Sequence, residues 1–383
     1  MKKVAFFIPD LGGAGAERVV SNLTQALAER GYDIFLILYN QSDVAYPFGG
    51  KLLTIDGRSN SILYKNKILK FLYRTYKLKM LKHKYKFDFV ISFLENPDFQ
   101  NILTKGKEKV YISVRNYASK SYSKSKKFIS KLLYRRADKI IAVSEGVKED
   151  LINNFLIQER KIKVIYNPYD LEKINLLAQE AIEGKFQDIF NKKCILNTGR
   201  LTRQKGQWHL IRVFSYVCNE FSDVELVFQG EGPLLEKLKR LAESLGIIDR
   251  VHFIGFQSNP FKFMKSSYIY ALTSLYEGFP NTLVEAMICG LPAISVNCKS
   301  GPKEILLRTK DSTDESYGIL LEEFQQNEDI EGLILSEEEK KMAARICQLL
   351  RNNEEYQIYR AKSIERSKDF RLTKIIEEWR KIL

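Results

Sequence analysis

The sequence predicts an α/β protein made of two tandem doubly wound domains, each a parallel sheet with helices on both faces. A chain of 383 residues that is 45% hydrophobic is long enough to form two cores of this kind. Near the N-terminus a strand, a glycine-rich loop, a helix and a second strand follow one another, and this order restarts at Cys194. Each copy is half of a nucleotide-binding fold unit. The expected domains are residues 1–168 and 172–367, and Asn167-Pro168 begins the linker.

The first domain is predicted from its apolar runs and the residues that interrupt them. Lys3 to Pro9 is an apolar run, typical of a strand buried on both faces of a parallel sheet. Glu17 to Arg30 follows as a helix, and Gly31 ends it. Further strands are expected at 34–38, 87–93, 110–114, 139–143 and 163–165.

The second domain repeats the order. A strand to Thr198, a glycine loop and a helix from Gln207 are followed by a strand at 225–229 and a helix at 234–245. Residues 311–339 are acidic, and we expect them to be rich in loops. Later strands are expected at 251–254, 268–272 and 292–296.

Glu277 and Glu285 are two carboxylates eight positions apart at a predicted strand-to-helix junction. The apolar run before Glu277 predicts a buried strand, and residues 282–289 predict a helix that Gly290 ends. Glu277 is therefore expected at the carboxyl end of the strand, and Glu285 inside the helix. Open α/β sheets bind ligands at this edge, and a helix N-terminus suits a phosphate. Because carboxylates accept hydrogen bonds from hydroxyl groups, the pair indicates a sugar-nucleotide site.

These two residues, with Gly278-Phe279-Pro280-Asn281 between them, resemble the Glu-x7-Glu motif of the retaining glycosyltransferases of family 4. The resemblance covers nearly the whole chain and is weakest between residues 51 and 109. It implies the GT-B architecture: two Rossmann-like domains facing a central cleft, with the final helix, residues 368–383, packed back onto the first domain. Four further landmarks of the family follow in order, each weak alone but strong as a set: Gly12 to Arg18, Gly199-Arg200-Leu201 with Lys205-Gly206, Gly230 to Pro233, and Val251 to Gly255.

The resemblance assigns the catalytic roles to Glu277, Arg200 and Lys205. Arg200 and Lys205 are expected to stabilise the nucleoside diphosphate, UDP or a similar group, as it leaves. Glu285 is expected to bind the ribose hydroxyls, and Glu277 to face the donor sugar. Whether Glu277 orients that sugar or stabilises positive charge on it stays open. The other donor-binding residues expected are Gly13, Gly15, Gly199, Gly278, Phe279, Pro280, Asn281, Thr282 and Leu283.

One position departs from the family. After the strand that ends at Val114, many relatives have a histidine near the donor sugar, whereas this chain has Arg115 and Asn116. A similar Arg-Asn pair occurs in relatives that build bacterial surface polysaccharides. Glu95 and Asn96 follow the preceding strand, and the alternative for them is a solvated loop. The acceptor-side candidates are thus Glu95, Asn96, Arg115 and Asn116.

The net charge of +14 lies in the N-terminal part of the chain. Residues 1–170 hold 31 Lys and Arg against 16 Asp and Glu, whereas the remainder holds 30 against 31. Segments 61–86 and 119–136 are basic and carry aromatic and aliphatic residues at helical spacing, which fits an anionic membrane surface. The alternative is an ordinary helix whose apolar face packs on the sheet. Nucleic acid is not expected, because no nucleic-acid module is visible.

No metal or cofactor is expected besides the nucleotide-sugar substrate. Asp311 and Asp314 are wrongly spaced for an Asp-x-Asp motif, and basic residues already serve the diphosphate. Five cysteines without Cys-x-x-Cys spacing indicate reduced packing residues of a cytosolic protein. The apolar run near the N-terminus is too short for a signal peptide, and no run approaches the ~18 residues of a membrane-spanning helix.

Together these observations predict a hexosyltransferase at the cytoplasmic face of the membrane. It would move a hexose or N-acetylhexosamine from a UDP-sugar, with retention, to a lipid-linked glycan or polysaccharide. The first alternative is a transferase with a small soluble acceptor. The second is a catalytically silent scaffold of a polysaccharide-assembly complex, against which the four residues Arg200, Lys205, Glu277 and Glu285 argue. One fold hosts many specificities, so the sugar itself is not predicted.

Overall fold

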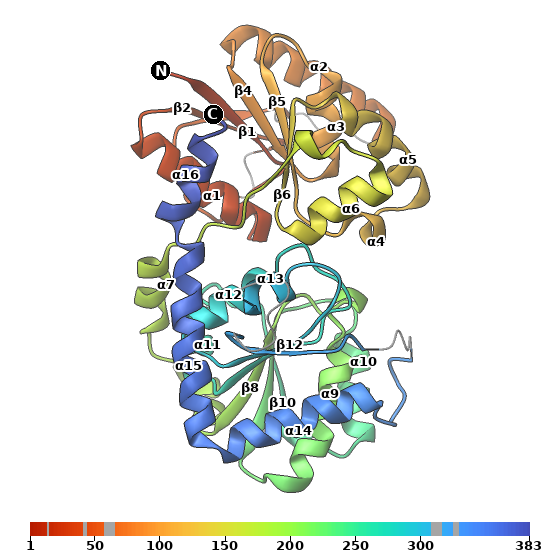
Figure 1. The fold of residues 1–383 in the computed structure, drawn as a ribbon, viewed down its shortest axis with the longest axis vertical. Helices are drawn as coiled ribbons and strands as arrows, with labels where there is room; N and C mark the ends of the chain where they lie inside the picture. The colour runs from red at the N-terminus through yellow and green to blue at the C-terminus, as the bar shows by residue number, and fades with distance from the viewer. Residues whose placement is uncertain (14, 41–43, 57–65, 308–315, 325–328) are drawn as a thin grey trace. The chain divides into compact units, whose positions relative to one another are not determined.

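The computed structural model describes all residues except 14, 41–43, 57–65, 308–315 and 325–328. The chain forms two compact units. Unit 1 contains Met1–Tyr169 and Phe370–Leu383, and unit 2 contains Asp170–Asp369. Within each unit, helices lie on both sides of a sheet (Figure 1).

Unit 1 is built on a seven-stranded sheet with the order β3-β2-β1-β4-β5-β6-β7, and all its strand pairs are parallel. The strands are β1 (Lys3–Phe7), β2 (Asp33–Leu38), β3 (Lys51–Thr54), β4 (Phe89–Phe93), β5 (Lys109–Val114), β6 (Lys139–Ala142) and β7 (Ile162–Val164). The α-helices are α1 (Gly15–Glu29), α2 (Lys67–Tyr85), α3 (Glu95–Leu103), α4 (Ala118–Ser121), α5 (Lys124–Leu133), α6 (Glu145–Phe155) and α16 (Leu372–Arg380).

Both faces of the first sheet are buried, because side chains alternate along each strand. Phe6 of β1 joins a core with α1 and with Trp379 of α16, while Phe7 joins a core with Leu78 of α2. The C-terminal segment is fastened to unit 1 by a hydrogen bond from the Tyr111 hydroxyl to the Ile382 carbonyl at 2.9 Å. This double burial explains the unbroken apolar runs of the central strands.

Unit 2 is built on a six-stranded parallel sheet with the order β10-β9-β8-β11-β12-β13. The strands are β8 (Lys193–Thr198), β9 (Val224–Gln229), β10 (Val251–Gly255), β11 (Ile269–Leu272), β12 (Ala293–Val296) and β13 (Ile319–Leu321). The α-helices are α7 (Leu171–Ala178), α8 (Gln187–Phe190), α9 (Gln207–Glu220), α10 (Leu235–Ser244), α11 (Phe261–Ser266), α12 (Asn281–Ile288), α13 (Pro302–Leu306), α14 (Glu337–Arg351) and α15 (Asn353–Ser367).

The two parallel sheets confirm the predicted doubly wound α/β class. Two elements correct the expectation of a loop-rich segment at 311–339: β13 extends the second sheet at 319–321, and α14 begins at Glu337 behind a Ser336 capping box. Asp311 and Asp314, the poorly spaced acids, lie outside the described residues, as do Ala14 and the basic stretch 61–65.

Candidate active site

Two loops of unit 2 meet where the strand order reverses. The chain runs from β8 outward to β10 and then returns to place β11 on the other side of β8. The carboxyl ends of β8 and β11 therefore flank the topological switch point, where open α/β sheets bind ligands. Gly199 and Arg200 follow β8, and Glu277 follows β11.

The two predicted carboxylates lie where the sequence placed them. Glu277 is in the loop between β11 and α12, and Glu285 is in the second turn of α12. Both are buried, with 5% and 2% of their surface exposed. Buried carboxylates require polar partners, so these side chains belong to an internal polar cluster rather than to a solvated surface.

Lys205 is the direct partner of Glu277. Its Nζ lies 2.6 Å from Oε1 of Glu277, and the Ser274 hydroxyl donates to the same oxygen at 2.7 Å. The pair is largely shielded, with side-chain exposures of 19% and 7%. The structure thus brings together two of the three residues predicted to be catalytic, and adds Ser274.

The Lys205 loop is held in place by its neighbours in the β11–α12 loop. The Thr273 hydroxyl donates to the Lys205 carbonyl at 3.1 Å, and the Gln204 side chain donates to the Tyr276 carbonyl at 3.0 Å. Gly206 has a φ of +60°, and a Cβ there would lie 2.3 Å from the Thr273 carbonyl oxygen. Glycine is therefore required at this position for both conformation and space.

Arg200 lies at the exposed end of the same cluster. Burial and Glu277 raise the pKa of Tyr276, and Arg200 opposes this shift through its positive charge. Arg200 is thus within electrostatic range of the Glu277 loop, and in the described part of the chain its guanidinium has no ion-pair partner. Gly199, which precedes it, donates its N–H to the Gln229 carbonyl at 2.9 Å.

The N-terminus of α12 completes the cluster. Pro280 is its N-cap residue, and Asn281, Thr282 and Leu283 form its first turn, whose N–H groups provide positive potential. Gly278 accepts a hydrogen bond from Ser300 at 2.9 Å, and Phe279 is buried. These residues directly follow Glu277 in the chain and place a helix N-terminus next to it in sequence.

Tyr270 and Ser274 were missed by sequence reasoning. The Tyr270 hydroxyl donates to Oγ1 of Thr282 at 2.6 Å, and burial raises the pKa of Tyr270. Tyr270 stands in an apolar strand, so the sequence marked it as core. Ser274 lies three residues before Glu277, and this short spacing was the available signal.

The glycine loop of unit 1 is satisfied by its own residues. The Gly13 N–H donates to the Glu17 carboxylate at 2.6 Å, and the Gly13 carbonyl accepts from the Tyr46 hydroxyl at 2.9 Å. Gly15 begins α1. A phosphate at this loop would have to displace or face the Glu17 carboxylate.

The acceptor-side candidates stand at the carboxyl ends of two adjacent strands. Glu95 is the first residue of α3, 3.5 Å from the Lys126 ammonium, and Asn96 beside it is exposed. Arg115 follows β5, hydrogen-bonds Asn167 and lies over the Phe93 ring. Burial lowers the pKa of Arg115 to about 10. Asn116 accepts from the next backbone N–H, that of Tyr117, at 2.9 Å.

Asp98 is a further buried acid that the sequence did not single out. It is 1% exposed in α3, and burial raises its pKa well above the ordinary value. Ser92 forms a hydrogen bond with it that opposes this shift. Burial thus disfavours the charged form of this carboxyl relative to a solvent-exposed one.

The basic segment 61–86 is divided by the fold. In α2, Lys82 is buried, with Nζ 2.8 Å from Oε1 of Glu108, and Arg74 pairs with Asp56 beneath Tyr39. These two cations are internal, as expected for the side of the helix that packs on the rest of unit 1. The opposite side of α2 nevertheless carries exposed apolar residues: Ile68, Leu69, Leu72, Tyr76 and Met80.

Two further features concern the described ranges as a whole. None of their helices is both long and apolar enough to cross a bilayer. Nor do they contain three or more His, Cys, Asp or Glu side chains grouped to hold a metal ion.

Comparison with known proteins identifies the class. The model described as "Glycosyltransferase Family 4" matches residues 13–173, and "Glycosyl transferases group 1" matches residues 179–366. An uncharacterized glycosyltransferase of Methanocaldococcus jannaschii is 34% identical over 359 residues, 87% of each chain. The N-acetylgalactosamine-N,N'-diacetylbacillosaminyl-diphospho-undecaprenol 4-alpha-N-acetylgalactosaminyltransferase of Campylobacter jejuni is 33% identical over 89% of this chain and 92% of that protein.

The fold has the same class of neighbours. The crystal structure of Anabaena HepE in complex with UDP and glucose has a TM-score of 0.79 and 17% identity, and covers 100% of this chain and 99% of that one. Fold, site and relatives define a hexosyltransferase enzyme with the GT-B fold. The chain belongs to glycosyltransferase family 4, which confirms the resemblance read from the Glu277–Glu285 segment.

Proposed function

We propose that this enzyme transfers a hexose or N-acetylhexosamine from a UDP-sugar, with retention, to a lipid-linked glycan at the cytoplasmic membrane face. The observation that carries the proposal is the shielded Lys205–Glu277 pair at the switch point of the second sheet. It joins a phosphate-binding cation to a sugar-facing carboxylate in a single cluster.

The donor diphosphate takes Arg200 and Lys205 as its cations. Charge-assisted hydrogen bonds from these groups strengthen as negative charge grows on the departing phosphate. Backbone N–H groups of Thr282 and Leu283 at the start of α12 add to this stabilisation. Two fixed positive charges make a metal ion unnecessary, and we expect a chelator to leave the rate unchanged.

The two carboxylates bind different parts of the donor apart from its diphosphate. Glu285, inside α12, accepts hydrogen bonds from the ribose hydroxyls, and Glu277 faces the transferred sugar. Attack from the same face as the leaving diphosphate gives retention, and the departing phosphate removes the acceptor proton. The UDP in the HepE structure agrees with this choice of donor.

The acceptor is assigned from a relative and from the surface of unit 1. The Campylobacter relative is named for transfer to a diphospho-undecaprenol-linked glycan. Ile68, Leu72, Tyr76 and Met80 recur every four residues along α2 and are 71%, 56%, 60% and 51% exposed. Such an apolar stripe with exposed lysines beside it suits the interface of an anionic bilayer.

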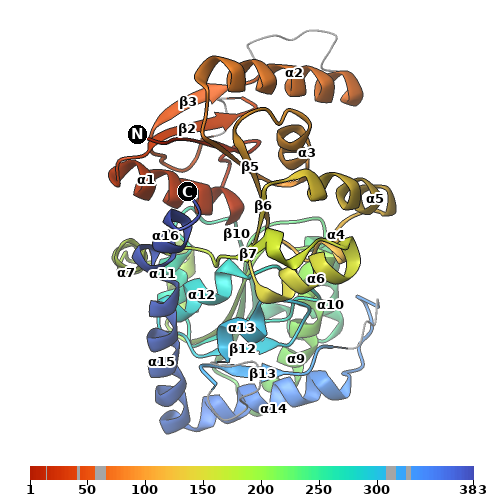
Figure 2. The same ribbon diagram turned by 45° about the horizontal axis from the view of Figure 1, so that its top comes forward.

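A second helix extends this membrane surface. In α5, Phe128, Ile129 and Leu132 are exposed, and Lys124 and Lys127 lie on the same helix. Both α2 and α5 pack against α3, and in Figure 2 α2 runs along the outside of unit 1. Helices α2 and α5 thus meet the membrane through one side of each, while Lys82 and Arg74 do not take part.

The donor is tested by UDP release from a panel of UDP-sugars on vesicles that carry a polyprenyl-diphosphate-linked glycan. We expect one sugar to be transferred at an unchanged rate with EDTA, and NMR of the product to show the anomeric configuration of the donor. Glu285→Gln should raise the Kd for UDP, because the ribose diol loses a charged acceptor worth about 1.5–3 kcal/mol. Transfer to a water-soluble sugar alone would favour the small-acceptor alternative. Failure to bind any nucleotide sugar would favour the scaffold.

The membrane surface is tested by vesicle flotation. Leu72→Ser with Tyr76→Ser should weaken binding to anionic vesicles, and Lys79→Glu should add about 1 kcal/mol to the loss. The matched control is Lys237→Glu, an exposed lysine of unit 2. Equal binding by all these variants would remove α2 from the proposed surface.

A further inference from the structure

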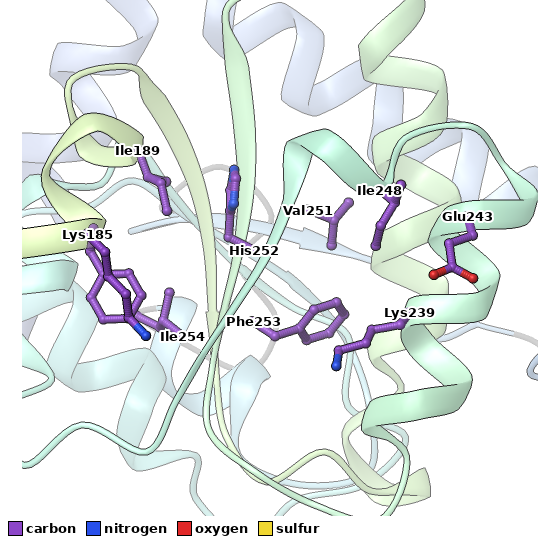
Figure 3. Close-up of a pocket in the computed structure, with 10 residues that line it drawn as sticks. Lys185, Ile189, Lys239, Glu243, Ile248, Val251, His252, Phe253 and Ile254 are labelled. Atoms are coloured by element: carbon purple, nitrogen blue, oxygen red, sulfur yellow. The ribbon is translucent and has the colours of Figure 1, made fainter.

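The second sheet has an open edge at β10. This strand is last in the order of the sheet, so one side of its backbone has no partner strand among the described residues. A cavity of about 420 Å³ follows this edge and is lined from both faces of the sheet (Figure 3). Its apolar lining consists of Phe186, Ile189, Ile248, Val251, Phe253 and Ile254.

β10 differs from the other edge strands of the two sheets. Edge strands are protected from pairing when they are short or carry charged residues. Among the described strands, β3 begins with Lys51, β7 contains Lys163, and β13 has three residues. β10 has five, Val-His-Phe-Ile-Gly, with no lysine and no proline. β10 is thus the longest of these four edge strands, and its register with β9 shifts between Phe253 and Gly255, so its regular edge runs over Val251, His252 and Phe253.

The edge is also held rigid before any partner binds. The Arg250 guanidinium donates to the carbonyls of Phe221 and Val224, each at 2.6 Å. His252 contacts the Glu225 carboxylate through Nε2 at 2.8 Å. A preformed edge loses little conformational entropy on pairing.

Charges beside the edge indicate the occupant. Lys239 and Glu243 are four residues apart on α10 and line the cavity next to Val251 and Phe253 (Figure 3). A two-fold axis perpendicular to the sheet, placed just outside the middle of β10, would make two copies of the strand antiparallel neighbours and set their α10 helices antiparallel on one face. Lys239 would then face Glu243 of the partner subunit, and the second such pair would follow by symmetry.

We propose that β10 is a homodimer interface in which two copies of this chain join their second sheets edge to edge. The exposed parts of Phe253 and Ile248 form its apolar centre, and the two Lys239–Glu243 pairs form its rim. Lys239 also pairs with Glu236 at 3.1 Å within its own helix, but both side chains are too exposed for that pair to hold it firmly. β9 and β8 separate β10 from β11, so the Lys205–Glu277 cluster stays uncovered.

The two Lys239–Glu243 pairs, which the two-fold symmetry of the proposed dimer relates, allow the interface to be tested by charge reversal. Light scattering with size exclusion, over roughly 1–100 µM, should show a concentration-dependent dimer for the unmodified full chain. Lys239→Glu or Glu243→Lys alone puts like charges opposite each other twice and should raise the dimer Kd about tenfold. The double variant Lys239→Glu with Glu243→Lys should restore the dimer. Mixed with the unmodified chain, the double variant should form a heterodimer about tenfold more weakly than either homodimer, because that pairing again sets like charges opposite each other twice.

The controls separate this interface from general effects. Lys237→Glu changes the charge of the same helix away from the cavity and should leave the dimer unchanged. Thermal melting of every variant checks that the fold persists. A chain that stays monomeric over the whole concentration range overturns the proposal. So does a dimer that ignores both single variants, or that the double variant fails to restore.

Discussion

The Lys205–Glu277 pair leads to opposite predictions for its two members. If Lys205 binds the donor diphosphate, Lys205→Met should weaken UDP binding. Glu277 competes with the diphosphate for the same ammonium and repels it, so Glu277→Gln should strengthen UDP binding. The same Glu277→Gln change should nevertheless abolish most sugar transfer, because the carboxylate that faces the sugar is gone.

The sizes of the two effects follow from the geometry. Nζ of Lys205 is 2.6 Å from Glu277, and a diphosphate oxygen on its other side would lie roughly 6 Å from the carboxylate, about two hydrogen-bond lengths. At an effective dielectric constant of about 20–80, two unit charges at that distance repel by roughly 0.7–2.8 kcal/mol. Glu277→Gln should therefore lower the Kd for UDP at least about threefold. Lys205→Met removes a charge-assisted hydrogen bond of about 1.5–3 kcal/mol and should raise the Kd roughly 10- to 100-fold.

Isothermal titration of UDP into both variants measures these shifts, and UDP-sugar turnover measures the loss of transfer. Lys237→Met is the matched control for the loss of one lysine in unit 2 and should leave both quantities unchanged. The reasoning fails if Glu277→Gln weakens UDP binding as Lys205→Met does. Glu277 would then act by holding Lys205 in position, and the carboxylate and the phosphate would not compete.

Three further predictions concern the buried Lys82–Glu108 pair, its pH dependence and the Lys205 loop. Lys82→Met should lower the free energy of unfolding, measured by urea titration, by about 3–5 kcal/mol, because Glu108 stays buried without its partner. Adding Glu108→Leu should recover most of the lost free energy of unfolding. Burial lowers the pKa of Lys82 to about 8, below its unfolded value, so the unfolded chain binds more protons between about pH 8 and 10.5. Between these pH values, the unfolding free energy of the unmodified chain should rise with pH relative to that of the double variant Lys82→Met with Glu108→Leu. Parallel pH profiles of the unmodified chain and the double variant would contradict this prediction. Gly206→Ala should displace the Lys205 loop, because the added Cβ would meet the Thr273 carbonyl. The variant should therefore have a higher Kd for UDP and a lower melting temperature. An unchanged Kd would show that the loop adapts to the alanine.

The central strands and the site segment were predictable because their signals are local. The strands at the middle of each sheet are buried on both faces, which produces apolar runs in the sequence. β3 was missed because its residues are half exposed, and β13 because three residues carry no periodic pattern. Whether an edge segment forms a strand depends on the neighbouring strand, whose residues are distant in the sequence, so the local sequence of the segment does not predict it.

The candidate site divides in the same way. Glu277 and Glu285 could be predicted from their spacing at a strand-to-helix junction, and Lys205 from the resemblance of its glycine loop to that of the family. Thr273 and Tyr270, which fasten the cluster, could not be recognised, because their roles depend on contacts with residues about 70 and 12 positions away. The same limit applies to Lys82, whose partner Glu108 is 26 positions along the chain.

These pairings decide which positive charges are available for function. The surplus of basic residues in 1–170 counts Lys82 and Arg74 together with the exposed lysines of α2, although a buried carboxylate neutralises each of the two. Lys205 is neutralised as well, yet its partner Glu277 follows a strand end at the switch point, where we propose that the donor binds. A lysine or arginine in an internal ion pair is therefore excluded as a ligand-binding group only when its carboxylate partner lies outside the ligand site. By this criterion Lys82 and Arg74 are excluded and Lys205 is not. The opposite responses of UDP binding to changes at Lys205 and Glu277 measure this distinction directly.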